Sequence, residues 1–168
     1  MRQPPSFDAT VALGDYATPI DGLLLALKFG HRLELASVLG ALLAERVPPL
    51  ADASLVLVPV PLSFERLAER GFNQSNEIGR ATARTLGLRF DDAVLVRVRH
   101  APAQASLPRE ARRRNIRGAF VARRALPGMR FGVVDDVMTT GSTLDEIARV
   151  LKAAGAQHVI NLVVARTP

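Results

Sequence analysis

Two adjacent carboxylates, Asp135 and Asp136, are followed after two residues by the hydroxyl-rich run T-T-G-S-T at residues 139–143. Two ionised carboxylates side by side are costly to bury unless hydroxyls, a cation or water pair with them. The T-T-G-S-T run offers hydroxyl donors, successive backbone N–H groups and a glycine that lets the backbone approach a ligand closely. Acids that bind hydroxyls, next to amides that bind anions, predict a site for a ribose and a phosphate.

The elements on either side of these motifs place them at one edge of a sheet. Phe131, Val133 and Val134 are β-formers that predict a short buried strand ending at the acids. A helix is expected to begin near residue 142 or 143, because apolar residues then recur at helical spacing: Leu144, Ile147, Ala148 and Leu151. Alone, the acids would be an ordinary strand end and the hydroxyls an ordinary helix cap. Their ordered combination favours an anion site at the carboxyl end of a strand.

Other kinds of chemistry fit the sequence less well. The chain has no cysteine, which excludes disulfides and thiolate metal sites. Its histidines, His31, His100 and His158, are too scattered to predict a zinc ligand set, and we expect them on the surface or in loops. A Walker A loop is absent, because the G-x-x-x-x-G-K-[ST] pattern does not occur. A dehalogenase-type D-x-D is ruled out at this run because its two aspartates are adjacent.

Strands and helices alternate through the rest of the chain. After an irregular start over residues 1–17, Thr18 as a cap with Pro19 behind it predicts a first helix, and a second helix should end at Pro48. The remaining expected elements are strands over 54–60, 94–98 and 159–164, a loop over 61–72 with Arg66 and Arg70, and a helix capped by Asn73 that ends near Gly87.

This order predicts an α/β fold with a doubly wound, mainly parallel sheet. A length of 168 residues fits a single domain, divided here into a helical lead-in (1–50) and an α/β core (54–168). No apolar run approaches the roughly 18 residues of a membrane span, and the first residues lack the apolar core of a signal peptide. We therefore expect a cytoplasmic protein without membrane contact.

Arginine carries almost all of the positive charge. The net charge is +6, and Lys28 and Lys152 are the only lysines among 22 basic residues. Residues 99–115 combine Pro102 and Pro108 with a cluster of arginines: Arg109, Arg112, Arg113 and Arg114. This segment is either a mobile loop that orders over a polyphosphate or a solvated basic helix face, and the run itself does not decide between them. Arginine suits both a polyphosphate and a nucleic acid.

The run at residues 131–143 resembles the phosphoribosyl diphosphate (PRPP) signature of type I phosphoribosyltransferases. Nearly the whole chain is similar to the competence protein F (ComF) family. The matching motifs stand in the expected order: Tyr16 with Lys28 and Phe29, V-P-V-P-L-S, R-G-F-N-Q-S, the set Arg97, Gln104, Leu107, Arg112 and Asn115, Gly118 with Phe120, and V-V-D-D-V-M-T-T-G-S-T. The resemblance implies a type I phosphoribosyltransferase-like fold that binds PRPP with magnesium.

The resemblance also implies roles for individual residues. Asp135 and Asp136 would hold the ribose hydroxyls, directly or beside a magnesium ion that PRPP brings, and Arg112 would stabilise the departing pyrophosphate. These three are the expected catalytic residues. The expected PRPP-binding residues are Thr139, Thr140, Gly141, Ser142, Thr143, Pro61, Leu62, Ser63, Arg70 and Gln104.

Three departures from the family pattern limit what carries over. Family members commonly have an amino-terminal zinc ribbon, but this sequence has no cysteine, so zinc binding is not carried over. Ala101 stands where the family often has threonine. Thr139 stands where purine-salvage relatives have an aspartate suited to take a proton from the incoming base. Hypoxanthine and guanine are therefore not expected as substrates.

The sequence leaves several functional questions open. We expect transfer of ribosyl phosphate with release of pyrophosphate, and the family name implies a role in competence and DNA uptake. The alternative is a protein without turnover that senses PRPP or binds single-stranded DNA or a helicase-like partner. Base stacking has little support, because no aromatic residue lies between Arg97 and Asn115. The acceptor is unknown, and a homodimer stays open.

Overall fold

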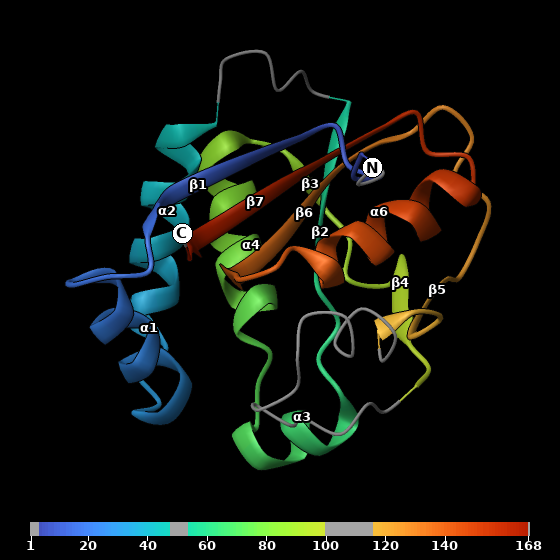
Figure 1. Cartoon of the computed structure of the whole chain (residues 1–168). Helices are drawn as coiled ribbons and strands as arrows, with labels where there is room; N and C mark the ends of the chain where they lie inside the picture. Colours follow the sequence, from blue (N-terminus) through green and yellow to red (C-terminus); the bar gives the residue numbers. More distant parts are fainter. Residues whose placement is uncertain (1–3, 48–53, 100–115, 168) are drawn as a thin grey trace.

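The protein is built around a parallel five-stranded sheet with the strand order β1-β7-β6-β2-β3 (Figure 1). The computed structural model describes residues 4–47, 54–99 and 116–167. The five strands are β1 (Ala9–Asp15), β2 (Leu55–Pro59), β3 (Arg89–Phe90), β6 (Arg130–Met138) and β7 (His158–Arg166). A separate antiparallel pair is formed by β4 (Leu95–Arg97) and β5 (Phe120–Ala122). The predicted α/β fold with a doubly wound, mainly parallel sheet is confirmed.

Helices cover both faces of the sheet. The described helices are α1 (Ile20–Phe29), α2 (Glu34–Arg46), α3 (Phe64–Arg70), α4 (Gln74–Leu86) and α6 (Ser142–Ala153). α1, α2 and α4 cover one face, while α6 and the β4–β5 pair cover the other (Figure 1). No described helix has both the length and the apolar composition that a membrane crossing requires.

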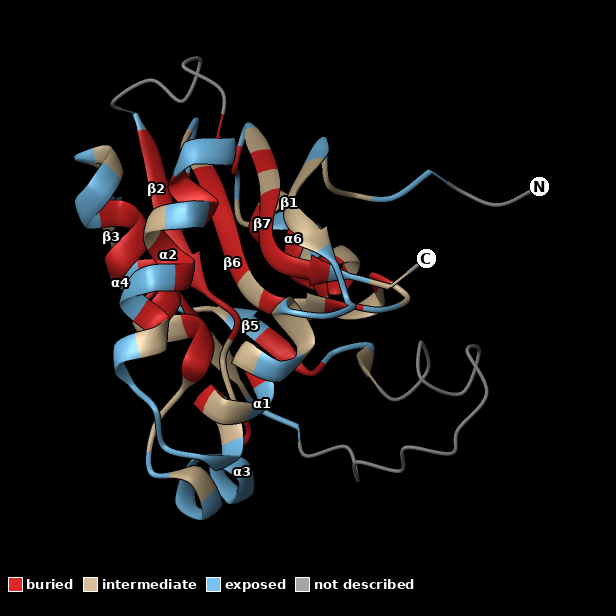
Figure 2. Cartoon of the chain, turned by 90° about the vertical axis from the view of Figure 1, so that its left-hand side faces the viewer, coloured by how far each residue is buried: buried red, intermediate tan, exposed pale blue. Residues whose placement is uncertain are grey.

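Two hydrophobic cores form because side chains alternate between the faces of a strand. In β2, Leu55 and Leu57 face the core under α1, α2 and α4, whereas Val56 and Val58 face the core under α6. Strands that are buried on both faces read as continuous apolar runs, which is how the sequence predicted β2. Figure 2 shows β2 and β6 as a buried centre between helices with exposed outer surfaces.

The strand order reverses between β2 and β6. β2 is paired with β3 on one side and with β6 on the other. From β2 the chain passes through α4 to β3, and it later returns to β6 on the opposite side. In doubly wound sheets, ligands bind outside the carboxyl ends of the strands at such a reversal. The segments after β2 and β6 are therefore the two expected walls of a binding site.

Several predicted elements differ from the structure. Residues 9–15, predicted to be irregular, form the edge strand β1 along β7; all of its residues are partly or largely exposed, so the sequence shows little periodicity. Residues 64–70, predicted as loop, form α3, which ends at Gly71. The strand predicted over 94–98 pairs antiparallel outside the main sheet. Thr18 is not the cap of α1, whose N-cap is Pro19, without a side-chain hydrogen bond.

Candidate functional site

Asp135 and Asp136 lie within β6, near its carboxyl end. The sequence predicted a strand that stops at these acids, but β6 runs on to Met138 because its last residues stay paired with β7. Its pairing with β2 ends earlier, at Val134 opposite Pro59. The acids therefore lie past the last β2–β6 pair, at the point where the strand order reverses.

The start of α4 contacts both acids. Ser75 Oγ donates a hydrogen bond of 3.0 Å to Asp135 Oδ1, and Gln74 Nε2 donates one of 3.4 Å to Asp136 Oδ2. Asn73 caps the helix by accepting from the Ser75 amide at 3.0 Å, as the sequence predicted. Its Nδ2 also donates to the carbonyl of Val60 at 3.0 Å and so ties the segment after β2 to α4. The R-G-F-N-Q-S motif therefore reaches the acidic pair directly.

The acidic pair is short of positive charge. Burial, and next the neighbouring charge of Asp136, raise the pKa of Asp135 from 3.8 to about 8. Asp136, which is 6% exposed, is paired with Lys28 at the end of α1. Groups arranged in this way favour a ligand that brings hydroxyl donors or a cation to Asp135.

The hydroxyl-rich turn joins β6 to α6. Gly141 occupies the position before the helix with φ of 73°, a left-handed conformation that glycine adopts without strain. Thr140 Oγ1 and Ser142 Oγ lie 2.9 Å apart and share a hydrogen bond. The Ser142 amide, the first of α6, donates to Thr140 Oγ1 at 3.4 Å, and the cap residue Gly141 has no side chain to bond the amides that follow. The helix begins at Ser142, as predicted, and its amino end suits an anion.

The opposite wall of the site follows β2. Ser63 caps α3, accepting from the Arg66 amide at 3.4 Å, and it is buried. Arg70, the last residue of α3, donates from Nη1 to Gln74 Oε1 at 3.0 Å. Because Gln74 also bonds Asp136, Arg70 is joined to the acidic pair through one amide side chain.

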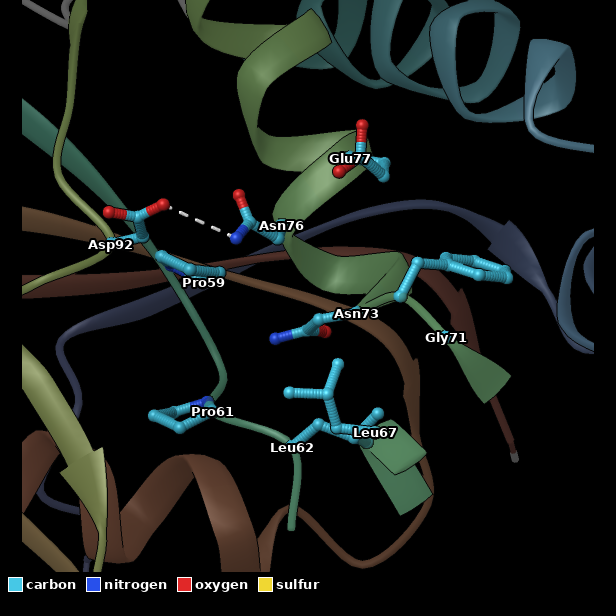
Figure 3. Close-up of a pocket in the computed structure, with 10 residues that line it drawn as sticks. Pro59, Pro61, Leu62, Leu67, Gly71, Asn73, Asn76, Glu77 and Asp92 are labelled. Atoms are coloured by element: carbon cyan, nitrogen blue, oxygen red, sulfur yellow. Dashed lines mark hydrogen bonds between the residues drawn. The ribbon is translucent and has the colours of Figure 1, made fainter. Parts of the chain in front are cut away.

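A pocket of about 390 Å³ lies beside this wall (Figure 3). Pro61 and Leu62, both expected PRPP-binding residues, line it together with Asn73. Its remaining lining residues are Pro59, Leu67, Gly71, Phe72, Asn76, Glu77 and Asp92. The acidic pair is not among the lining residues. The segment after β2 therefore lines a pocket that extends toward Asp92, two residues past β3.

The structure brings together most of the expected site residues, but not all can be placed. The acids lie at the reversal of strand order, the hydroxyl-rich turn follows β6 directly, and Arg70 is joined to Asp136 through Gln74. Arg112 and Gln104 lie outside the described residues. Within the described ranges, no three histidine, aspartate or glutamate side chains gather as a metal site.

Sequence reasoning missed the contacts of Lys28, Gln74 and Ser75. All three stand in motifs that carry the family likeness, but no role was assigned to them. Their place in these motifs was the only signal in the sequence. The structure adds that Gln74 and Ser75, polar residues in the first turn of α4, are both buried. Buried polar side chains need partners, and here the partners are the two acids.

The chain is similar to several known proteins. A family model described as phosphoribosyl transferase domain matches residues 73–168. DNA utilization protein YhgH of Salmonella typhi is 37% identical over 167 residues, or 95% of this chain and 72% of that protein. Competence protein F of Haemophilus influenzae is 33% identical over 168 residues, or 95% of this chain and 73% of that protein. A solved structure of the allosteric regulatory enzyme of purine biosynthesis has 27% identity and a TM-score of 0.49, over 76% of this chain and 25% of that one.

The sheet, the reversal of strand order and the acidic run before a hydroxyl-rich turn define an α/β protein of the phosphoribosyltransferase type. The family model covers more than half of the chain, and the two named relatives align with nearly all of it. The chain therefore belongs to the phosphoribosyl transferase domain family, in the ComF group that includes competence protein F and the DNA utilization proteins.

Proposed function

We propose that the protein binds PRPP with magnesium and transfers its ribosyl phosphate to an acceptor, with release of pyrophosphate. The observation that carries this proposal is the meeting of two motifs at the reversal of strand order. Ser75 and Gln74, from the segment after β2, bond Asp135 and Asp136 on β6. A ligand bound beside the acids would lie next to the turn that follows β6 and next to Arg70, which Gln74 joins to Asp136.

Each part of the site has a task in this proposal. Asp135 and Asp136 accept hydrogen bonds from the ribose hydroxyls. The turn at residues 139–143 holds the 5-phosphate with its hydroxyls and with the amino end of α6. The segment of Pro61, Leu62 and Ser63 and the guanidinium of Arg70 face the pyrophosphate. Arg112 and Gln104 keep their expected roles there as sequence-based assignments.

The residues of the site fit a magnesium ion bound to the pyrophosphate. A pKa of about 8 at Asp135 marks a carboxyl group whose ionised form lacks a nearby cation. Magnesium is usually held by one or two carboxylates together with substrate phosphates, so the acidic pair with PRPP would complete its ligands. The ion would supply positive charge to the pyrophosphate as it leaves.

The proposed reaction exchanges one bond at the anomeric carbon for another. The bond from this carbon to pyrophosphate breaks, the pyrophosphate keeps the electron pair, and the acceptor nucleophile forms the new bond. Positive charge develops on the sugar, and nearby carboxylates stabilise it. Thr139 cannot take a proton near neutral pH, so the acceptor must arrive as an anion or need no base at this position.

Calorimetric titration with PRPP, with and without magnesium, tests the binding. We expect wild-type protein to bind in the presence of magnesium, and Asp135→Asn/Asp136→Asn to lose most of that affinity. An absence of heat from wild-type protein with magnesium would refute the proposal. Single-turnover release of pyrophosphate across candidate acceptors then tests transfer, and efficient turnover of hypoxanthine would contradict the assignment at Thr139.

A second candidate function is PRPP binding without turnover, in a protein that acts in DNA uptake or use. The relatives' names, which refer to DNA utilization and competence, and Thr139 in place of an acid support it. This candidate predicts PRPP binding but no pyrophosphate release with any acceptor. If single-stranded DNA is the partner, its affinity should fall steeply with salt, and neutralising Arg112, Arg113 and Arg114 should flatten that dependence.

A further inference from the structure

The end of α1 closes a ring of contacts around the acidic site. The Lys28 ammonium pairs with Asp136 Oδ2, and Gln74 Nε2 donates to the same oxygen at 3.4 Å. Gln74 Oε1 accepts from Arg70 Nη1 at 3.0 Å, and the Arg70 guanidinium carbon lies 5.3 Å from the centre of the Phe29 ring. Phe29 follows Lys28 in α1, so the path returns to its start. These five residues are called the contact ring below.

The contact ring joins two residues with different tasks in the proposed function. Asp136 faces the ribose and Arg70 faces the pyrophosphate, and they come from β6 and α3. Lys28 and Phe29 have no task in that scheme. The turn after α1 makes a second contact with the segment between Arg70 and Gln74. The rings of His31 and Phe72 lie edge to face, with 6.3 Å between their centres. The end of α1 is thus fastened to the same segment by two independent contacts.

The strength of the ion pair follows from its burial. The side chains of Lys28 and Asp136 are only 18% and 8% exposed. Removing one partner of such a pair leaves an uncompensated charge, which costs far more than breaking an exposed ion pair. On the other side of the contact ring, the Arg70 guanidinium lies over the face of Phe29 and donates to Gln74 Oε1. An arginine held in this way has less side-chain freedom to lose when a ligand arrives.

We propose that Lys28 and Phe29 are positioning residues that hold Asp136 and Arg70 at one fixed separation. The site then engages the ribose and the pyrophosphate of a single PRPP molecule together. This inference rests on the proposed function, but it assigns a role to residues which that function does not use. A fixed separation matters only for a ligand that spans both groups, since a fragment can settle against either group alone.

The test compares intact PRPP with its two halves. The variants Lys28→Met and Phe29→Ala open the contact ring at its two sides, and Leu25→Ala is the matched control because Leu25 is 48% exposed on the same helix. Calorimetric titrations with magnesium use PRPP, ribose 5-phosphate and inorganic pyrophosphate. Loss of one charged hydrogen-bonded contact corresponds to about a tenfold weaker affinity, which we expect for PRPP in Lys28→Met. Phe29→Ala removes a cation–π contact at a side chain that is 63% exposed, so we expect a smaller loss of about two- to fivefold.

Selectivity separates positioning from general damage to the fold. For ribose 5-phosphate and pyrophosphate alone, we expect both variants to stay within about twofold of wild type, because neither fragment spans the ring. In the double variant Lys28→Met/Phe29→Ala, PRPP affinity should fall by less than the product of the two single fold-losses, because the first substitution already opens the contact ring. Lys28→Arg and Phe29→Trp should recover most of the PRPP affinity, because they keep the charge and the aromatic face.

Three outcomes would overturn the inference. The first is an equal loss for all three ligands, or the same loss in Leu25→Ala, since either result would show only a weakened fold. The second is unchanged PRPP affinity in both Lys28→Met and Phe29→Ala, which would leave the proposed function standing. The third is a wild-type protein that does not bind PRPP, which would remove the proposed function as well.

Discussion

The two sides of the site stand on helices that are anchored very differently. α6, which begins at the hydroxyl-rich turn, buries Leu144, Ile147 and Leu151 in the core. α3, which ends at Arg70, buries no side chain, and its Phe64 remains 74% exposed. In Figure 2, α3 stands apart from the sheet and is drawn almost wholly in the colour of exposed residues. One side is fixed by packing, the other by helix caps and a few polar contacts.

This difference suits what each side does in the proposed reaction. The sugar 5-phosphate stays bound while the bond at the anomeric carbon changes, so its site gains from a rigid support. The pyrophosphate must leave, and because α3 buries no side chain, only the few contacts of the contact ring have to break before Arg70 can move. The contact ring then explains how Arg70 keeps its position on a helix that has no packing of its own.

The largest effect is expected from the packed side. Ile147 is fully buried under the sheet, so Ile147→Ala should lower the free energy of unfolding by about 2 to 5 kcal/mol. Leu67→Ala is the matched change on α3, where the side chain is 41% exposed, and it should cost less than about 1 kcal/mol. Urea unfolding of both variants measures the difference. Equal losses would contradict the contrast between the two helices.

The acidic pair should give the protein a distinctive pH dependence. The pKa of Asp135 is about 8 in the fold against an ordinary 3.8, because burial and Asp136 oppose its ionisation. Between these values the folded state holds a proton that the unfolded state has released, so unfolding free energy should fall as pH rises. The slope can approach about 1.4 kcal/mol per pH unit for a single proton.

Asp135→Asn removes this group, and the variant should unfold with a flatter pH dependence between about pH 4 and pH 8. The control is Glu69→Gln, which removes an exposed carboxylate on α3 and leaves Asp135 in place, so it should keep the slope of the wild-type curve. Urea unfolding at several pH values provides the measurement. Parallel curves for wild type and Asp135→Asn would show that the fold does not raise the pKa of Asp135.

A comparison of alanine variants at two glycines with the same backbone conformation distinguishes the effect of backbone strain from the loss of a ligand contact. Gly141 and Gly71 have φ of 73° and 77°, and an alanine in this region costs about 1 to 2 kcal/mol. Gly141→Ala also places its Cβ 2.6 Å from the end of Met138, whereas Gly71→Ala meets nothing within 4 Å. We expect a similar strain in both, but a clear loss of PRPP affinity only for Gly141→Ala, measured by calorimetry. An equal loss in Gly71→Ala would place the ligand elsewhere.

The sequence could predict the packed side because its signals lie within one continuous run. β-formers before Asp135, hydroxyls after it and the apolar spacing of α6 all stand within residues 131–151, so no long-range information is needed. Even there, the predicted end of β6 at the acids was wrong, because the strand runs on to Met138. Its last residues stay extended only because β7 pairs with them, and that pairing is invisible in a local pattern.

The other side could not be predicted because its contacts join distant parts of the chain. Gln74 and Asp136 are 62 residues apart, and Ser75 and Asp135 are 60 apart. α3 has no buried stripe to announce a helix, and Lys28 looks like any polar residue at a helix end. The R-G-F-N-Q-S motif indicated that the segment matters, but only the fold shows which of its side chains turn toward the acids.

The smallest effect is expected at Phe64, and it gives the most direct test of how α3 is held. A large aromatic side chain in a helix would normally be an anchor, but Phe64 is 74% exposed, so Phe64→Ala should change the free energy of unfolding by less than about 0.5 kcal/mol. Backbone amides of α3 should also exchange with solvent faster than those of α6 in wild-type protein, because local opening breaks few buried contacts. Hydrogen exchange measures this difference directly. A loss above about 1 kcal/mol in Phe64→Ala would exceed the range for an exposed side chain and show that α3 is anchored through its face. Arg70 would then owe its position to α3 itself, and Phe29 would be free of that task.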